Sequence, residues 1–291
     1  MQMNFPDERP DHAEGWPAAA SFPRRIGLIA GGGDFPLLLA RSARANGVEI
    51  IVFALKGFAS REMEMAADKV EWLELGQAEK AIQLMHAHGI TEVAMAGRVP
   101  HNSIFQYRHF DWRALKALAR AVNKKADSLL GIVTSELERA GIRVIDSTMF
   151  LKSLMPGAEL LTPARPLTKR ERHDIDFGYP IAKVVAGQDI GQTIVVKDGV
   201  VAAVEGIEGT DECILRAGRL AGGGCVVIKV SKPRQDNRFD VPVIGRQTLL
   251  SMRESHCAAL AFSAWQCLLF DREEVLRIAS EADIAIITVE G

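Results

Sequence analysis

Short apolar runs alternate with helical patterns through the first half of the chain, and this alternation limits the fold more than any other feature. Alternating strands and helices are typical of a parallel sheet built from βαβ units. The first half is therefore predicted to be an α/β, Rossmann-like domain. Its strands are predicted at residues 25–30, 49–54, 70–75, 92–96 and 142–145, and its helices at 35–46, at 78–88 and within 112–139.

The second half has a different pattern, which predicts a mixed α/β domain. A helical stretch at 175–187 precedes two apolar runs within 193–205. Between these runs lies Asp198-Gly199, a pair that favours the tight turn of a β-hairpin. Further strands are predicted at 225–230, 258–262, 267–270 and 284–289, and a helix at 271–282.

A proline-rich and then strongly charged segment separates the two halves. Three prolines between 156 and 166 are followed by the charged stretch 169–174, a composition that suits a linker or a crossing segment. A chain of 291 residues is long enough for two ordinary domains. We expect a disordered lead-in at 1–24, a Rossmann-like nucleotide-binding domain at 25–150, a linker at 151–180 and a C-terminal catalytic α/β domain at 181–291.

Charge and cysteine content exclude several classes of protein. Charged residues make up 25% of the chain and the net charge is −2, so the basic surface that binds nucleic acid is not expected. The cysteines form no C-x-x-C pair, which argues for reduced thiols in a cytoplasmic protein rather than for zinc ligands or disulfides. They are Cys213, Cys225, Cys257 and Cys267.

No segment has the length and apolar character of a membrane span. The longest weakly charged run, 256–270, is shorter than the roughly 20 apolar residues that a bilayer requires. Residues 1–21 lack an apolar core, so they are predicted to be neither a secretory signal nor an anchor. Peripheral contact with a membrane through Phe, Trp and Leu side chains stays open.

A run of glycines follows the first predicted strand. The backbone amides of Gly31, Gly32, Gly33 and Asp34, at the start of a helix, are a candidate phosphate site. The run departs from G-x-G-x-x-G because Pro36 stands near the place of the third glycine, which disfavours NAD. A tight strand-to-helix turn with Pro36 at the first helical position explains the same residues equally well.

Arg98 follows the fourth predicted strand, at the edge where open α/β sheets place their ligands. Its guanidinium group is a candidate contact for a phosphate or for uracil. A solvated loop arginine is at least as good an explanation of this residue.

The second half contains two polar segments that carry the strongest chemical signal. Each follows a predicted strand, and together they supply carboxylates for a hard cation, cations for phosphoryl oxygens and a helix N-terminus. This combination matches the needs of phosphoanhydride cleavage. The first segment contains Glu205, Glu208, Gly209, Thr210 and Asp211, and the second contains Lys229, Lys232, Arg234, Gln235, Asp236, Arg238 and Asp240.

The alternative explanation of the second segment is a loop held by surface ion pairs. Pro233, Pro242 and Gly245 exclude a helix there, so the mixed charges are not a solvated helix face. Surface ion pairs contribute little to stability and would not require so many charges. We therefore favour a functional loop.

Four stretches of the chain resemble the LpxI family of UDP-2,3-diacylglucosamine pyrophosphatases, and the likeness runs from about residue 25 to the end. The last two stretches are long and specific, whereas the glycine turn alone would prove nothing. The four are IGLIAGGG at 26–33, DIGQ at 189–192, AVEGIEGTD at 203–211 and KPRQDNRFDVPVIG at 232–245.

The resemblance implies a magnesium-dependent hydrolase of lipid A biosynthesis, which splits UDP-2,3-diacylglucosamine into UMP and 2,3-diacylglucosamine 1-phosphate (lipid X). It implies two domains around the substrate, a homodimer and the cytoplasm of a Gram-negative cell, with contact at the inner membrane left open. The nucleotide would bind largely to the N-terminal domain. An essential aspartate would correspond to Asp236 or Asp240, and water would attack the phosphorus nearer the sugar.

This resemblance leads to a hypothesis for each polar group, in which metal-bound carboxylates and nearby cations stabilise charge while water attacks in line. The catalytic residues are predicted to be Asp236, Asp240, Lys229, Lys232 and Arg238. The Mg²⁺ ligands are predicted to be Asp236, Asp240 and Glu205 or Glu208. The substrate-binding residues are predicted to be Gly31, Gly32, Gly33, Asp34, Arg98, Glu208, Gly209, Thr210, Asp211 and Gln235.

Two other functions match parts of the sequence. A nicotinamide-dependent enzyme of nucleotide sugars would hold NAD and need no magnesium. The imperfect glycine fingerprint counts against it, and no Tyr-x-x-x-Lys catalytic pair is expected, with Tyr107 and Tyr179 the only tyrosines. A non-catalytic sensor of nucleotide or lipid would bind UDP without turnover.

Overall fold

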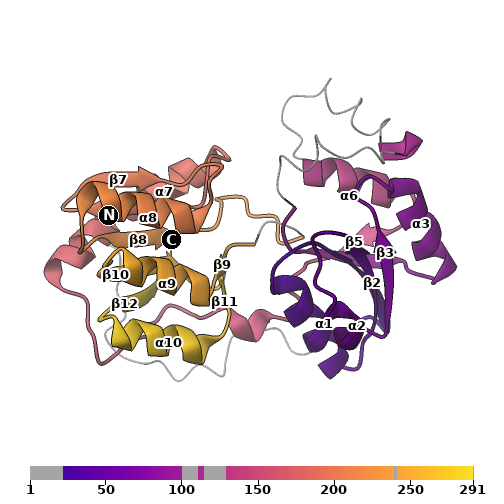
Figure 1. The fold of residues 1–291 in the computed structure, drawn as a ribbon, viewed down its shortest axis with the longest axis horizontal. Coiled ribbons are helices and arrows are strands. Elements are labelled where there is room, and N and C mark those ends of the chain that lie inside the picture. Colours follow the sequence, from indigo (N-terminus) through magenta and orange to yellow (C-terminus); the bar gives the residue numbers. More distant parts are fainter. Residues whose placement is uncertain (1–21, 100–110, 115–128, 239–240, 291) are drawn as a thin grey trace. The chain divides into compact units, whose positions relative to one another are not determined.

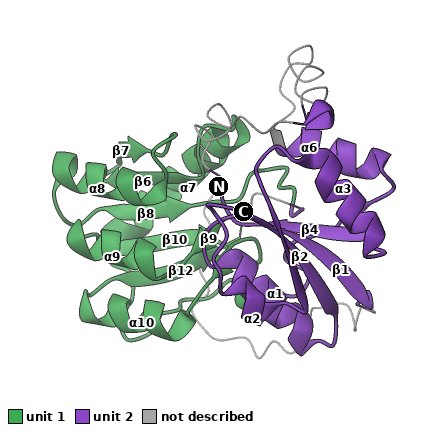
Figure 2. Ribbon diagram, turned by 45° about the vertical axis from the view of Figure 1, so that its right-hand side comes forward, with its two compact units in different colours: residues 1–14, 152–236, 240–291 green, residues 15–151, 237–239 purple. Residues whose placement is uncertain are grey.

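The computed structural model describes residues 22–99, 111–114, 129–238 and 241–290, which divide into two compact units (Figures 1 and 2). Unit 2 ends at Leu151 and also takes in Asn237 and Arg238. Unit 1 runs from Lys152 to Asp236 and resumes at 240. Most of the predicted lead-in, residues 1–21, lies outside the described residues.

Unit 2 contains a five-stranded parallel sheet with the order β3-β2-β1-β4-β5. This confirms the Rossmann-like parallel sheet. The strand order reverses between β1 and β4, as in doubly wound folds. Its elements are β1 (Arg25–Ala30), α1 (Phe35–Ala45), β2 (Glu49–Leu55), α2 (Met63–Ala66), β3 (Lys69–Leu73), α3 (Ala78–Ala87), β4 (Glu92–Ala96), α6 (Leu129–Arg139) and β5 (Arg143–Val144).

Both faces of this sheet are buried, which explains why its strands are nearly continuous apolar runs. Phe53 and Val93 face the helices α3 and α6, in one cluster with Met85 and Leu137. On the opposite face α1 packs with its buried residues Leu39 and Ala43 toward the sheet. α1 starts where the sequence predicts, because a proline stands in its first turn.

Unit 1 contains a mixed sheet with the order β12-β10-β8-β6-β7, in which β8, β10 and β12 are parallel and β6 is antiparallel to both neighbours. This confirms the second, mixed domain. Its elements are the 3₁₀ helix η1 (Lys152–Leu154), α7 (Lys169–Gly187), β6 (Thr193–Lys197), β7 (Val200–Val204), α8 (Thr210–Ala221), β8 (Val226–Lys229), β9 (Val243–Ile244), α9 (Arg246–Glu254), β10 (Ala259–Ser263), β11 (Leu268–Leu269), α10 (Arg272–Glu281) and β12 (Ala285–Val289).

Alternate residues of the strands in unit 1 face different helices. Val227 belongs to a buried cluster with α8, α9 and α10, which lie side by side in Figure 1. Its neighbours Val226 and Ile228 belong to the cluster beneath α7. Successive side chains of a strand point to opposite faces, so the sheet lies between two helical layers. Among the described helices, α7 covers one face, and α8, α9 and α10 cover the other.

The helix α7 begins at Lys169, six residues before its predicted start, so the charged stretch 169–174 is helical rather than part of a linker. The cause is a capping box. The Thr168 hydroxyl accepts from the Glu171 amide at 3.2 Å, and the Glu171 carboxylate accepts from the Thr168 amide at 2.8 Å. Arg165 also donates two bonds to Glu171, which anchors this helix start.

The predicted hairpin at Asp198-Gly199 is confirmed by the antiparallel pairing of β6 with β7. Both turn residues have a positive φ, 54° and 72°, as such a turn requires. The Asp174 carboxylate of α7 accepts bonds from both turn amides, at 3.0 and 2.7 Å. The turn is therefore attached to the helix that covers its sheet.

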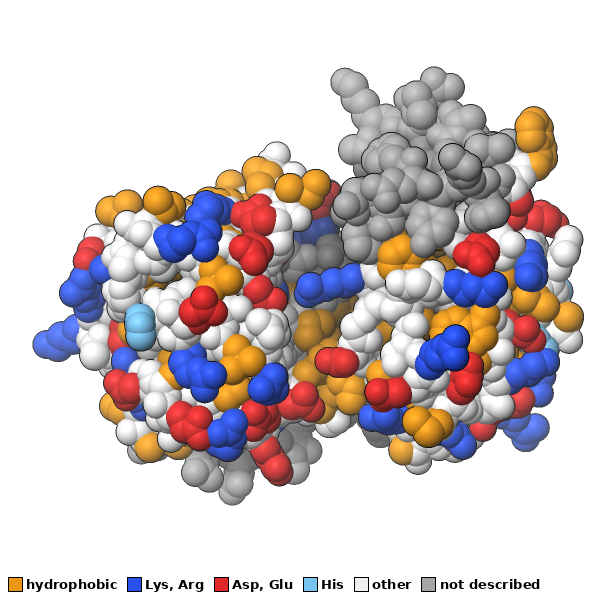
Figure 3. All heavy atoms as spheres, in the orientation of Figure 1, with side chains coloured by type: hydrophobic (Ala, Val, Ile, Leu, Met, Phe, Trp, Pro, Cys, Tyr) orange, Lys and Arg blue, Asp and Glu red, His pale blue; other side chains and the backbone are white. Residues whose placement is uncertain are grey.

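Charged side chains of both signs are interspersed over the visible face of each unit in Figure 3, without a continuous field of one sign among the described residues. Within the part of the chain that the structure describes, no helix combines the length and hydropathy needed to span a bilayer.

Candidate functional site

The switch point of the unit 2 sheet brings two predicted segments together. The glycine turn follows β1 and Arg98 follows β4, and these two strands are the neighbours between which the strand order reverses. In open α/β sheets, ligands bind in the crevice outside the carboxyl ends of the strands at this point. The fold therefore puts both segments where a ligand is expected.

The backbones of these two segments are paired directly with each other. The amide of Gly31 donates to the Ala96 carbonyl at 2.8 Å, and Gly32 and Arg98 exchange two amide-to-carbonyl bonds of 2.9 Å each. The amides of Gly31 and Gly32 therefore already donate to backbone carbonyls, which leaves the amides of Gly33 and Asp34 as the candidate phosphate donors of this turn. Within the described residues, the amides of Gly33 and Asp34 and the guanidinium of Arg98 have no protein acceptor.

The loops after β1 and β4 lie so close together that a side chain would not fit at Gly31 or Gly97. A Cβ on Gly31 would lie 2.9 Å from the Arg98 carbonyl oxygen. A Cβ on Gly97 would lie 2.7 Å from the Gly32 carbonyl oxygen, and Gly97 has a φ of +92°. Gly33 also has a positive φ, +89°, but open space surrounds its Cβ position. The run therefore serves backbone packing as well as any ligand.

In unit 1, the carboxyl end of β8 meets the start of β6 and the N-terminus of α8. The Lys229 ammonium, on a residue only 5% exposed, donates to the Thr210 hydroxyl at 2.6 Å. That hydroxyl donates to the Glu205 carboxylate at 2.8 Å and lies 3.4 Å from the hydroxyl of Thr193. Three of the predicted residues are thus joined in one chain of hydrogen bonds, Lys229 to Thr210 to Glu205.

The other predicted residues of the first polar segment lie around this chain. Glu208 accepts from Arg216 at 2.5 Å and from the Gly206 amide at 3.1 Å, and the Arg216 hydrogen bond lowers the pKa of Glu208. Asp211 lies in the first turn of α8. Nearby, the buried side-chain oxygen Oε1 of Gln192 finds no partner within the described residues, so it can accept from a ligand.

The structure divides the second polar segment between the two units. Lys232 pairs with Asp189, and its amide donates to Gln235 at 3.0 Å. Asp236 is the last residue of unit 1 before the loop passes to unit 2, where Arg238 pairs with Glu138 at 3.2 Å. The predicted ligand and catalytic residue Asp240 lies outside the described residues.

The predicted magnesium ligands stay a prediction, and the described residues give only the surroundings of some of them. They contain no group of three His, Cys, Asp or Glu side chains placed to hold a metal. Glu205 is a poor ligand, because one carboxylate oxygen accepts from Thr210 and the other from the Gln192 amide at 3.1 Å. Carboxylate oxygens suit a hard cation, and the assignment of Asp236 and Asp240 as ligands stays a prediction.

One group was missed by the sequence interpretation. Tyr179 and Lys183 do have the Tyr-x-x-x-Lys spacing, so the expectation that the chain lacks such a pair was wrong. The Tyr179 hydroxyl is buried, lies 2.8 Å from the Ser263 hydroxyl and donates to the Val289 carbonyl at 3.3 Å. Burial raises the pKa of Tyr179, which is opposite to what a catalytic base needs.

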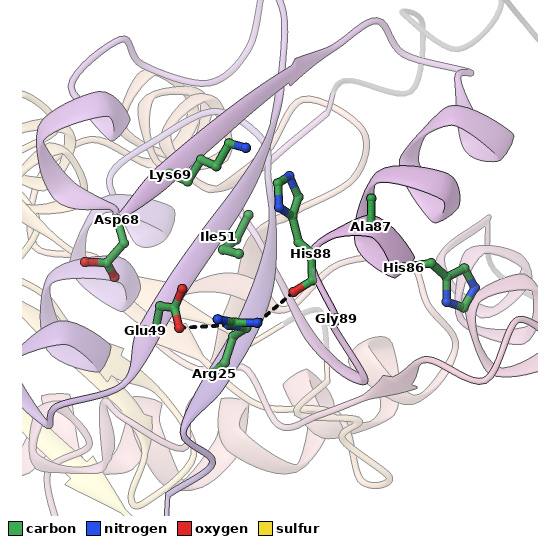
Figure 4. A pocket seen from close by; sticks show the side chains of 9 residues that line it. All are labelled: Arg25, Glu49, Ile51, Asp68, Lys69, His86, Ala87, His88 and Gly89. Carbon is green, nitrogen blue, oxygen red and sulfur yellow. Dashed lines mark hydrogen bonds and ion pairs between the residues drawn. The ribbon is translucent and has the colours of Figure 1, made fainter.

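A surface hollow of unit 2 lies away from these groups (Figure 4). It is lined by the first residues of β1, β2 and β3, at the amino-terminal edge of the sheet. Arg25 spans it and donates to Glu49 at 2.8 Å and to the His88 carbonyl at 2.9 Å. Since ligands of such sheets bind at the opposite edge, this hollow is not the candidate site.

The sequence matches one protein family in both units. Residues 25–154 match the LpxI N-terminal domain and residues 159–287 match the LpxI C-terminal domain. The chain is 31% identical over 280 residues to the UDP-2,3-diacylglucosamine pyrophosphatase LpxI of Caulobacter vibrioides, an alignment that covers 92% of this chain and 98% of that protein.

Similarity to solved structures is much weaker. A glycinamide-RNase-transformylase T from Mycobacterium tuberculosis is 16% identical, with a TM-score of 0.24, over 62% of this chain and 44% of that one. A phosphoribosylglycinamide synthetase from Anaerococcus prevotii is 10% identical, with a TM-score of 0.26, over 66% of this chain and 42% of that one. Likeness at this level carries no argument about function.

Proposed function

This chain belongs to the LpxI family, and we propose that it hydrolyses the pyrophosphate bond of UDP-2,3-diacylglucosamine as an enzyme of lipid A biosynthesis. The products are UMP and 2,3-diacylglucosamine 1-phosphate. The observation that carries the proposal is the polar edge of unit 1, where Lys229, Thr210 and Glu205 are joined beside a loop rich in carboxylates and cations.

The residues of unit 1 supply charge stabilisation for this reaction. A magnesium ion held by Asp236 and Asp240 would neutralise phosphoryl oxygens and lower the pKa of a bound water. Lys229 and Glu205 hold the Thr210 hydroxyl, which fixes the first turn of α8. A helix N-terminus in this position favours an anion.

Unit 2 is proposed to bind the nucleotide. Its support is the switch point, where the amides of Gly33 and Asp34 and the Arg98 guanidinium lie on adjacent loops without protein acceptors among the described residues. An arginine can bind a phosphate through two parallel hydrogen bonds. A homodimer in the cytoplasm, in contact with the inner membrane, is also proposed from the family resemblance, and light scattering and vesicle sedimentation test these two features.

The decisive experiment measures UMP release from UDP-2,3-diacylglucosamine, with magnesium and with a chelator. Wild type should turn over only with magnesium, and Asp236→Ala or Asp240→Ala should lower kcat by at least roughly a hundredfold. Glu62→Ala, which changes an exposed carboxylate of unit 2, is the matched control and should behave as wild type.

The same experiment separates the rival functions. Binding of UDP without release of UMP by the wild type would contradict the hydrolase and support a sensor. NAD retained through purification, with no need for magnesium, would support the nicotinamide enzyme.

A further inference from the structure

The ammonium group of Lys183, on α7, has an environment that the mechanism above does not use. It donates to the carbonyl and to the hydroxyl of Ser231, both at 3.2 Å, and lies 5.7 Å from the centre of the Tyr179 ring. The side chain is half-buried. No carboxylate among the described residues pairs with it.

Two other lysines at the carboxyl edge of the unit 1 sheet are linked to carboxylates. Lys232 pairs with Asp189, and Lys229 is linked through Thr210 to Glu205. A cation withdrawn from water without a counter-charge is unfavourable, and burial accordingly lowers the pKa of Lys183. The fold retains this cation although no acidic side chain among the described residues pairs with it, which points to an anion supplied from outside.

The position of Lys183 indicates which anion. Ser231 comes two residues after β8 ends at Lys229, directly before the loop that contains Asp236. The C-terminal end of α7 lies against that loop, since a Cβ on Gly187 would be 3.5 Å from the Pro233 ring. Lys183 is therefore at the start of the segment that the proposed function assigns to the pyrophosphate.

Ser231 is a rigid support for the ammonium group. It is fully buried, its hydroxyl bonds to Gln266, and its amide donates to the Ser263 hydroxyl at 3.3 Å. An ammonium group has three protons, and both protein acceptors of Lys183 belong to this one residue. At least one proton is thus left for a ligand oxygen.

We propose that Lys183 contacts the substrate, its ammonium group donating a hydrogen bond to a phosphoryl oxygen of the pyrophosphate. The proposal rests on the proposed function for the identity of the substrate. It adds a residue of the helix α7 to the cations that the sequence predicted to contact the substrate, Lys229, Lys232 and Arg238. The Ser231 contacts orient the ammonium before the anion arrives, which is the arrangement that stabilises developing charge.

The first test measures the affinity of inorganic pyrophosphate by calorimetry, which needs no turnover. Lys183→Met should weaken binding roughly ten- to a hundredfold, the usual worth of a hydrogen bond between charged groups, and Lys183→Arg should recover part of the loss. Lys197→Met is the matched control, because the Lys197 ammonium donates to the Ala221 carbonyl at 2.6 Å in the same unit. An affinity of Lys183→Met equal to that of wild type would overturn the proposal.

A second test uses the wild-type protein, so it remains informative if the methionine variant fails to fold. Trace acetylation followed by mass spectrometry gives the reactivity of each lysine with and without pyrophosphate. Pyrophosphate should slow acetylation of Lys183 and leave Lys197 unchanged. Equal reactivity of Lys183 in both samples would overturn the proposal.

The two proposals fail in different ways. If wild type binds pyrophosphate through Lys183 but releases no UMP, the hydrolase is wrong and the anion contact stands. If wild type releases UMP and Lys183→Met has unchanged kcat and KM, the hydrolase stands and the contact is wrong.

Discussion

The two units place their candidate sites by one rule but build them from different groups. In unit 2 the carboxyl edge at β1 and β4 is made of backbone, with Gly32 and Arg98 bonded to each other and no room for a side chain on Gly31 or Gly97. In unit 1 the corresponding edge is made of side chains, with Lys229, Thr210 and Glu205 in contact.

This difference predicts how each unit responds to change. Where two backbones are in close contact, an added side-chain atom has no room and should lower the stability of the unit. Where buried polar side chains are hydrogen-bonded to one another, removing one of them leaves its partner unsatisfied and should lower the stability of the unit. Substitutions that add an atom in unit 2 or remove a polar group in unit 1 therefore test this difference between the units.

The largest effect is expected from Lys229→Met in unit 1. Removing the buried ammonium leaves Thr210 and Glu205 without their cation, and loss of one partner of a buried charged group costs roughly 3–5 kcal/mol. Urea denaturation measures this loss. Combined with Thr210→Val, the two changes should be non-additive by more than about 0.5 kcal/mol, and strict additivity would contradict a joined network.

The next effect is expected from Gly97→Ala in unit 2. The new Cβ would collide with the Gly32 carbonyl and take an unfavourable φ, which together cost roughly 2–4 kcal/mol. Gly33→Ala is the matched control, since it has a similar φ but open space, and should cost only about 1 kcal/mol. Equal losses by thermal denaturation would show that backbone packing does not govern this edge.

A pH-dependent effect is expected from Glu171→Gln, at the start of α7. Burial alone would raise the pKa of Glu171, but hydrogen bonds from Arg165 and Thr168 lower it below 4.5. The carboxylate therefore stabilises the fold above its unfolded pKa, and this stability is lost as the pH falls through its folded pKa. The variant should lose roughly 2 kcal/mol at pH 7, and its deficit should shrink in acid, whereas a constant deficit would exclude this linkage.

A smaller effect, on activity alone, is expected from Arg98→Met. Loss of one phosphate contact should lower kcat/KM about tenfold, or about 1.4 kcal/mol, mostly through KM. The free energy of unfolding should stay within about 0.5 kcal/mol of wild type. Arg41→Met, at an exposed ion pair of α1, is the control. An equal loss of kcat/KM in this variant would contradict a substrate contact by Arg98.

The smallest effect is expected from Glu49→Gln, in the hollow of Figure 4. Glu49 and Arg25 have side chains 45% and 44% exposed, and such pairs are worth roughly 0.2–1 kcal/mol. UMP release should be unchanged. A large loss of turnover would instead place function at the amino edge of the unit 2 sheet.

Several strands and turns could be predicted from the sequence because neighbouring residues alone determine them. The bounds of β1 and β4 agree with the prediction, since each is an apolar run between polar residues or glycines. The hairpin turn followed from Asp198-Gly199, whose backbone preference is a property of those two residues. α8 begins at Thr210, so the first polar segment supplies the helix N-terminus that the sequence predicted.

Other local signals were present and overlooked. The capping box of Thr168 and Glu171 marks the start of α7, although the high charge of this stretch suggested a linker. The Tyr-x-x-x-Lys spacing at Tyr179 could also have been read directly.

The two α/β domains, the family and the polar loops follow from the amino-acid sequence alone, because periodicity, turn preference and motif spacing are properties of neighbouring residues. Three-dimensional packing was needed to show that the Gly31 and Gly32 amides are taken by the loop after β4, and that Lys183 lies against Ser231, 48 residues away. The physical reason is that strand order and burial are set by packing between distant segments, and these decide which polar groups have partners.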